Sequence, residues 1–93
     1  MHILEEYRSA LREAFDTWGK DSQVMMALEE MAELSKELLK NINRKKNNKK
    51  NITEELADVY VTLESLKIIY NISDIELCEI IDKKVLKLKN KLV

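Results

Sequence analysis

Apolar residues recur every three or four positions along most of the chain, which is the spacing of helices with one apolar face. This pattern predicts four helices, at residues 3–18, 22–42, 53–70 and 73–91. Gly19 is a natural stop between the first two, because glycine readily adopts the backbone conformation that ends a helix. The sequence has no proline and one glycine, so the turn signals of a β fold are missing. We therefore expect an all-α protein.

Polar residues mark the starts of the last two predicted helices. Thr53 can cap the third helix, and Ser73 with Glu76 matches a capping box at the start of the fourth. Residues 43–51 form a polar, basic loop between the second and third helices. Helices joined by such short connections predict a four-helix bundle in a single domain, residues 1–93.

Two of the predicted helices differ in how their apolar residues are distributed. The third is apolar nearly all round, which is typical of a central, buried helix. The fourth has one apolar stripe that we expect to face inward: Leu77, Ile80, Ile81, Val85, Leu88 and Leu92. A 93-residue chain can bury only a modest core, and such short chains often gain stability by oligomerising.

Charge and cysteine usage narrow the functional classes. The formal net charge is −1, so no overall field favours binding to nucleic acid or to a membrane surface. No apolar run is long enough to span a bilayer. The single cysteine, Cys78, excludes an internal disulfide, which agrees with a reducing cytoplasm, and it is expected to be a small buried apolar residue.

Two pairs of acidic residues carry the candidate chemistry, namely Glu30 with Glu33 and Glu55 with Asp58. A spacing of three places both members of a pair on one helix face. Antiparallel packing of the second and third helices would bring the pairs face to face. Carboxylates so placed repel one another unless a cation neutralises them, and Mg²⁺ or Mn²⁺ prefers oxygen ligands. The sequence therefore predicts a site for a hard divalent cation.

The same spacing also occurs in Glu13 with Asp16 and in Glu76 with Glu79, where it is typical of an exposed, charged helix face. The surroundings distinguish Glu55 and Asp58 from these exposed pairs. They lie on the helix with the most apolar sequence, where an uncompensated carboxylate is costly.

With their flanking residues, the acidic pairs resemble the MazG-like all-α nucleoside triphosphate pyrophosphohydrolases. That family has the motif E-x-x-E followed, after a variable spacer, by E-x-x-D. The runs Trp18-Gly-x-x-Ser-Gln23 and Lys84-Val-Leu-Lys87-Leu88 are also similar to short bacterial and phage members. The resemblance covers about residues 15–90 and implies a MazG-type four-helix fold, completed by oligomerisation into a homodimer or homotetramer.

The resemblance also implies an activity, namely Mg²⁺-dependent hydrolysis of a nucleoside triphosphate to the monophosphate and pyrophosphate. The catalytic metal ligands would be Glu30, Glu33, Glu55 and Asp58. Lys84 matches a position that contacts substrate phosphates. Lys87 stands where relatives often have arginine, so the charge is kept but the bidentate fork is lost. Trp18 could stack on a base and Gln23 could bind a base edge, although packing or a solvated helix start also accounts for them.

Two other functions remain open at this point. Phosphoribosyl-ATP pyrophosphohydrolases look similar in fold and acid pattern, but the basic motif expected before the first acids is missing here. A non-catalytic helical oligomerisation module, with the acids as surface charge, belongs to a different class. Stabilisation by Mg²⁺ would distinguish that module from either enzyme.

Overall fold

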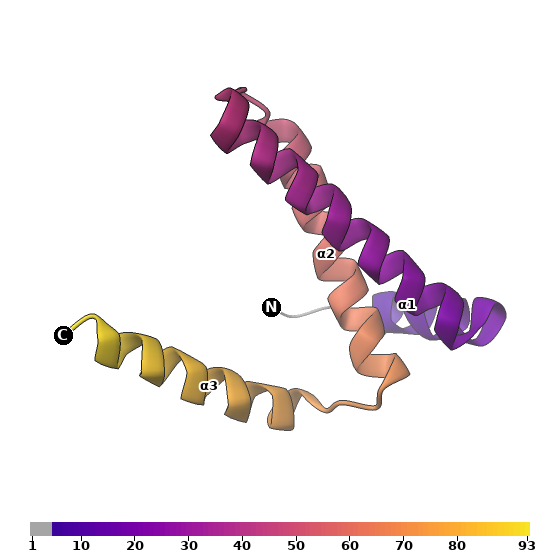
Figure 1. The fold of residues 1–93 in the computed structure, drawn as a ribbon. Coiled ribbons are helices and arrows are strands. Elements are labelled where there is room, and N and C mark those ends of the chain that lie inside the picture. Colours follow the sequence, from indigo (N-terminus) through magenta and orange to yellow (C-terminus); the bar gives the residue numbers. More distant parts are fainter. Residues whose placement is uncertain (1–4) are drawn as a thin grey trace.

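The computed structural model describes residues 5–93, and all regular secondary structure within them is helical. Figure 1 shows three helices: α1 (Glu5–Arg44), α2 (Lys49–Ile69) and α3 (Asp74–Lys91). α1 and α2 form an antiparallel hairpin, and α3 extends away from it. The all-α prediction is confirmed, and none of the helices in the described part is long and apolar enough to cross a membrane.

The first two predicted helices are two arms of one element, α1. Gly19 has φ 83° and ψ 169° and interrupts the helical backbone there, so the predicted break is in the right place. An L-residue with a side chain rarely adopts this conformation, whereas glycine does so without steric cost. The predicted start at residue 3 lies outside the described residues. A kink therefore occurs where a complete helix end was expected.

The connection between α1 and α2 is shorter than the sequence indicated. Lys45, with φ 50°, follows the end of α1, and α2 already begins at Lys49. Thr53 lies one turn inside α2 and donates its hydroxyl proton to the main-chain oxygen of Lys49 at 2.8 Å, so its prediction as a helix cap was wrong. The cap position belongs to Asn48, whose side chain makes no capping hydrogen bond.

Asn48 is instead turned back onto α1. Its amide nitrogen donates to the main-chain oxygen of Glu37 at 2.9 Å and to the Glu37 side chain at 3.0 Å. Asn41 donates to the Asn48 side-chain oxygen at 3.3 Å. Both Asn48 and Glu37 are buried. These contacts hold the loop end of the hairpin closed, and they depend on residues 11 positions apart.

The turn between α2 and α3 uses local signals at both ends. Asn71, with φ 52°, ends α2 in a Schellman motif, in which Ile72 N–H donates to the Lys67 carbonyl at 2.8 Å. α3 starts with the predicted capping box: Glu76 N–H donates to Ser73 Oγ at 3.2 Å, and Ser73 N–H donates to the Glu76 side chain at 2.8 Å. This capping box prediction is confirmed.

The seam between α1 and α2 is polar where a core would be apolar. Ala27 is the only buried apolar residue in the described part of the chain. The buried polar residues are Gln23, Glu37, Asn48, Thr62, Glu64 and Ser65. α2 was predicted to be buried all round, but Leu56 and Val61 are 43% and 49% exposed. The prediction of a central helix is therefore wrong within a single chain.

The predicted four-helix bundle does not form within one chain either. No part of α3 packs against α1 or α2 at the level of the backbone. The stripe predicted to face inward is exposed apart from half-buried Leu77, and Cys78, predicted to be buried, is exposed too. The radius of gyration is 15.8 Å, whereas a compact domain of this length has one of about 12 Å. The chain therefore leaves most of its large apolar side chains uncovered.

Candidate metal centre

Three of the four predicted acidic residues converge across the α1–α2 seam. Glu30 on α1 and Glu55 and Asp58 on α2 each offer one carboxylate oxygen, and these oxygens all lie within 4.8 Å of one another. Glu30 and Glu55 are half-buried and Asp58 is exposed. The antiparallel hairpin thus brings Glu30 to two side chains that lie 25 and 28 residues further along the sequence.

Glu33 lies beside this group and outside it. Its side chain is exposed, and it does not share the 4.8 Å cluster. Its negative charge still contributes to raising the pKa of both Glu30 and Glu55. Glu33 is therefore close enough to act on the group electrostatically.

The electrostatics of the group are unfavourable without a positive charge. Burial, followed by the charge of Asp58, raises the pKa of Glu30, and the same two causes raise the pKa of Glu55. Glu55 Oε2 is buried and has no hydrogen-bond partner. None of the ion pairs within residues 5–93 includes Glu30, Glu55 or Asp58. A hard divalent cation would supply the missing charge and accept these oxygens as ligands.

Glu37, one turn beyond Glu33, has a different role. Hydrogen bonds from Asn48 and Lys40 lower the pKa of Glu37 to about 2. Lys40 also forms an ion pair with it at 3.2 Å. Because its oxygens are already bonded, Glu37 serves the hairpin turn and does not extend the free acidic surface.

The two candidate base-binding residues lie near the kink. Gln23 is buried on the α1–α2 seam, and its Nε2 has no hydrogen-bond partner. Trp18 immediately precedes Gly19 and is 61% exposed. The Trp18 indole is therefore accessible to another molecule, whereas Gln23 is neither at a solvated position nor accessible to a base in this conformation.

The two candidate phosphate-binding lysines are not near the acids of their own chain. Lys84 and Lys87 are exposed on α3, and α3 packs against neither helix of the hairpin. Within one chain, the structure therefore does not assemble the lysines and the acidic residues into one site.

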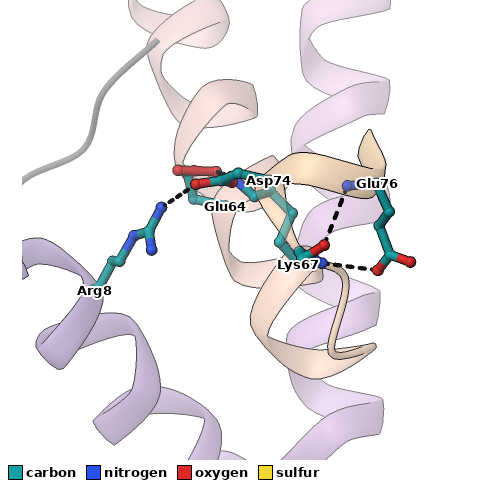
Figure 2. A network of polar contacts seen from close by, with 6 residues as sticks. Arg8, Glu64, Lys67, Asp74 and Glu76 are labelled. Atoms are coloured by element: carbon teal, nitrogen blue, oxygen red, sulfur yellow. Dashed lines mark hydrogen bonds and ion pairs between the residues drawn. The ribbon is translucent and has the colours of Figure 1, made fainter. Parts of the chain in front are cut away.

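A second charged cluster, which we did not predict, joins α3 to the hairpin (Figure 2). Arg8 forms an ion pair with Asp74 at 2.9 Å, and Lys67 pairs with Asp74 and, at 2.6 Å, with Glu64. These two cations lower the pKa of Asp74 to about 2. The cluster borders an open cavity of about 610 Å³ that also includes Arg12. Arg8 lies 66 positions from Asp74 in sequence, so no local sequence pattern could have revealed its part in the cluster.

Comparison with known proteins adds no relatives: no protein family, curated protein or solved structure matches this chain.

Proposed function

We propose that this chain is a Mg²⁺-dependent nucleotide pyrophosphohydrolase that converts a nucleoside triphosphate or its deoxy form, with water, to the monophosphate and pyrophosphate. The supporting observation is the convergence of Glu30, Glu55 and Asp58 oxygens within 4.8 Å, with no ion pair to any of them among residues 5–93. Three carboxylates from two rigid helices make a suitable donor set for Mg²⁺, which keeps further positions for water and phosphate.

Each acidic residue would have a definable task. Glu30, Glu55 and Asp58 would hold the cation, which when bound neutralises polyphosphate charge and lowers the pKa of a coordinated water. Glu33, beside them and exposed, would complete the ligand set or accept a proton from that water. Positioning and electrostatic stabilisation supply most of the catalysis in phosphoryl transfer, and this inventory can provide both.

The proposed enzyme would act as a homodimer or homotetramer. The exposed apolar residues of α2 and α3 support this part of the proposal, because a monomer rarely leaves so much apolar surface in water. Mn²⁺ could replace Mg²⁺, since both prefer oxygen ligands. A cytoplasmic location would suit the exposed free thiol of Cys78, which a reducing compartment protects.

The test is release of pyrophosphate, distinguished from orthophosphate, from a panel of nucleoside and deoxynucleoside triphosphates with Mg²⁺. We expect Glu55→Gln and Asp58→Asn each to lower kcat/KM by about 100-fold or more, because metal catalysis contributes several kcal/mol. Glu13→Gln is the matched control, since Glu13 is an exposed acid in a pair of the same spacing.

Three outcomes would contradict the proposal. Full activity in Glu55→Gln or Asp58→Asn would exclude a metal centre at these residues. Hydrolysis of phosphoribosyl-ATP without hydrolysis of simple triphosphates would assign the chain to the related histidine-pathway activity. Absence of any Mg²⁺-dependent hydrolysis would favour the non-catalytic helical module.

A further inference from the structure

We propose that α3 is an exchanged arm that docks on the acidic side of the α1–α2 hairpin of a second copy of this chain. By the acidic side we mean the face of the hairpin that carries Met26, Glu29 and Glu33 of α1 and Asp58 and Val61 of α2. Residues at these spacings share one face of each helix. The arm would carry Lys84 to the acidic group of the second copy.

The arm has an apolar stripe that neither α1 nor α2 covers. Ile80, Ile81, Val85 and Leu88 are 52%, 46%, 43% and 55% exposed. α3 has 18 residues, and isolated helices of that length are only marginally stable in water. An apolar stripe on such a helix generally finds its stability in packing against a partner.

Lys84 restricts which surface the apolar stripe can contact. It lies on the same helix face as Leu77, Ile81 and Leu88, at spacings of seven, three and four residues. A lysine in the middle of an apolar contact must meet a carboxylate there, since an unpaired charge is costly to bury. The second half of α3, residues 83–91, contains five lysines and no acidic residue. The partner surface should therefore be apolar at one end and acidic at the other.

The acidic side of the hairpin has that order. Met26 and Val61 are 44% and 49% exposed. One turn further toward the loop, Glu30 and Asp58 belong to the acidic group, which forms no ion pair within the described residues. In the first half of α3 the apolar side chains of the stripe match the first region, while Glu76, Glu79 and Asp82 lie outside the stripe. The lysines of residues 83–91 match the second region.

The start of α3 directs the arm toward another molecule. Arg8 and Lys67 both bind Asp74, the first residue of α3, and the capping box fixes the turn before it (Figure 2). Held in this way, α3 extends away from its own hairpin (Figure 1). Exchange with a second copy keeps this direction of α3 and both ion pairs. Reciprocal exchange of an identical element is a low-cost route to a closed dimer.

Charge reversal tests the arrangement through association alone, so no catalytic activity is needed. We expect Lys84→Glu and Glu33→Lys each to raise the dimer dissociation constant at least about tenfold in sedimentation equilibrium, as opposed charges become like charges. An equimolar mixture of the two variants should recover wild-type association, because each arm then meets an opposite charge on the other chain. Lys83→Glu, with the same charge change about 100° round the helix and away from the apolar stripe, should leave association unchanged.

The mixture distinguishes exchange from folding back within one chain. If α3 docks on its own hairpin, the mixture of the two variants will still associate weakly. A single chain that carries both Lys84→Glu and Glu33→Lys will then recover wild-type association. That result would overturn the proposal. A monomeric wild-type protein, or a dimer that Lys84→Glu leaves intact, also overturns it. Far-UV circular dichroism of each variant confirms that helix content is retained.

The native thiol provides a second measurement. Cys78 is exposed near the start of α3, at the edge of its stripe, and it is the only cysteine. With a benzophenone maleimide on Cys78, irradiation of mixed ¹⁴N- and ¹⁵N-labelled protein should give mixed-isotope crosslinks to the acidic side of the hairpin. Crosslinks within one chain, or only between two α3 helices, contradict the exchanged arm.

Discussion

Asn48 donates its side-chain amide to both the main-chain oxygen and the side-chain carboxylate of Glu37, at 2.9 and 3.0 Å. Asn48 is 4% exposed, so these bonds form away from water. They replace the helix cap that Asn48 would otherwise supply, and they join the two helices beside the loop. The turn of the hairpin therefore depends on a contact between elements as well as on local sequence.

Removing this amide should destabilise the hairpin. We expect Asn48→Ala to lower the free energy of unfolding by about 1–3 kcal/mol, because Glu37 loses two of the hydrogen bonds to its oxygens in a buried position. Urea unfolding followed by circular dichroism measures the effect. Asn47→Ala, at the exposed neighbouring position, is the control and should change stability by less than about 0.5 kcal/mol. Equal effects of the two substitutions would contradict a specific role for Asn48.

The joint at Asp74 should make the attachment of α3 sensitive to acid. Hydrogen bonds from Lys67 and Arg8 lower the pKa of Asp74 from 3.8 to about 2. A lowered carboxyl pKa means that folding favours the charged form, so its stabilising contribution is complete above about pH 4 and is lost as pH falls toward 2. Thermal melts of wild type and Asp74→Asn should therefore differ at neutral pH and converge near pH 2.

The control for this pH dependence is Asp82→Asn, which changes an exposed carboxyl on the same helix. It should leave the melting curve close to that of wild type at every pH. A difference between wild type and Asp74→Asn that persists unchanged at pH 2 would show that Asp74 acts through something other than its charge.

Gly19 should tolerate no side chain without loss of stability. Its φ of 83° with ψ of 169° lies in a region that is almost restricted to glycine, although nothing within 4 Å would obstruct a Cβ. We expect Gly19→Ala to cost about 1–3 kcal/mol in unfolding free energy. Gly19→Asn should not recover it, because asparagine favours a smaller ψ. Thr17→Ala, on the exposed helix surface, serves as the control, and a neutral Gly19→Ala would contradict the strain argument.

Local signals in the sequence predicted local structure well. Gly19 marked the break in α1, and Ser73 with Glu76 marked the start of α3, because each signal acts through its own backbone neighbours. Thr53 is not the cap because α2 begins one turn earlier, after Asn48, whose side chain bonds to a residue distant in sequence. Predictions of this kind fail where a contact between elements overrides a local preference.

The candidate site was predictable only as far as the hairpin. Spacing placed Glu30, Glu55 and Asp58 on two helix faces, and antiparallel packing made those faces meet. The position of Lys84 relative to these acidic residues could not be predicted from spacing, since it depends on where α3 packs. Helix periodicity identifies the apolar stripe of α3 without identifying the molecule that covers it.

Mg²⁺ should stabilise the protein if the acidic group is a metal centre. A ligand present at 100 times its dissociation constant and bound only by the native state adds about 2.7 kcal/mol to stability. For a domain of this size, each 1 kcal/mol raises the melting temperature by about 4–8 °C, which differential scanning fluorimetry resolves. Sodium chloride at matched ionic strength controls for general screening of charge.

Glu30→Gln should both raise the stability of the metal-free protein and abolish its response to Mg²⁺. The metal-free gain arises because the substitution removes one charge from a half-buried group of like charges, where the pKa of Glu30 is already raised by burial and by Asp58. Glu13→Gln, which alters an exposed acid outside the group, should preserve the response to Mg²⁺. A Mg²⁺-induced shift of equal size in Glu30→Gln and wild type would place the bound cation elsewhere on the molecule.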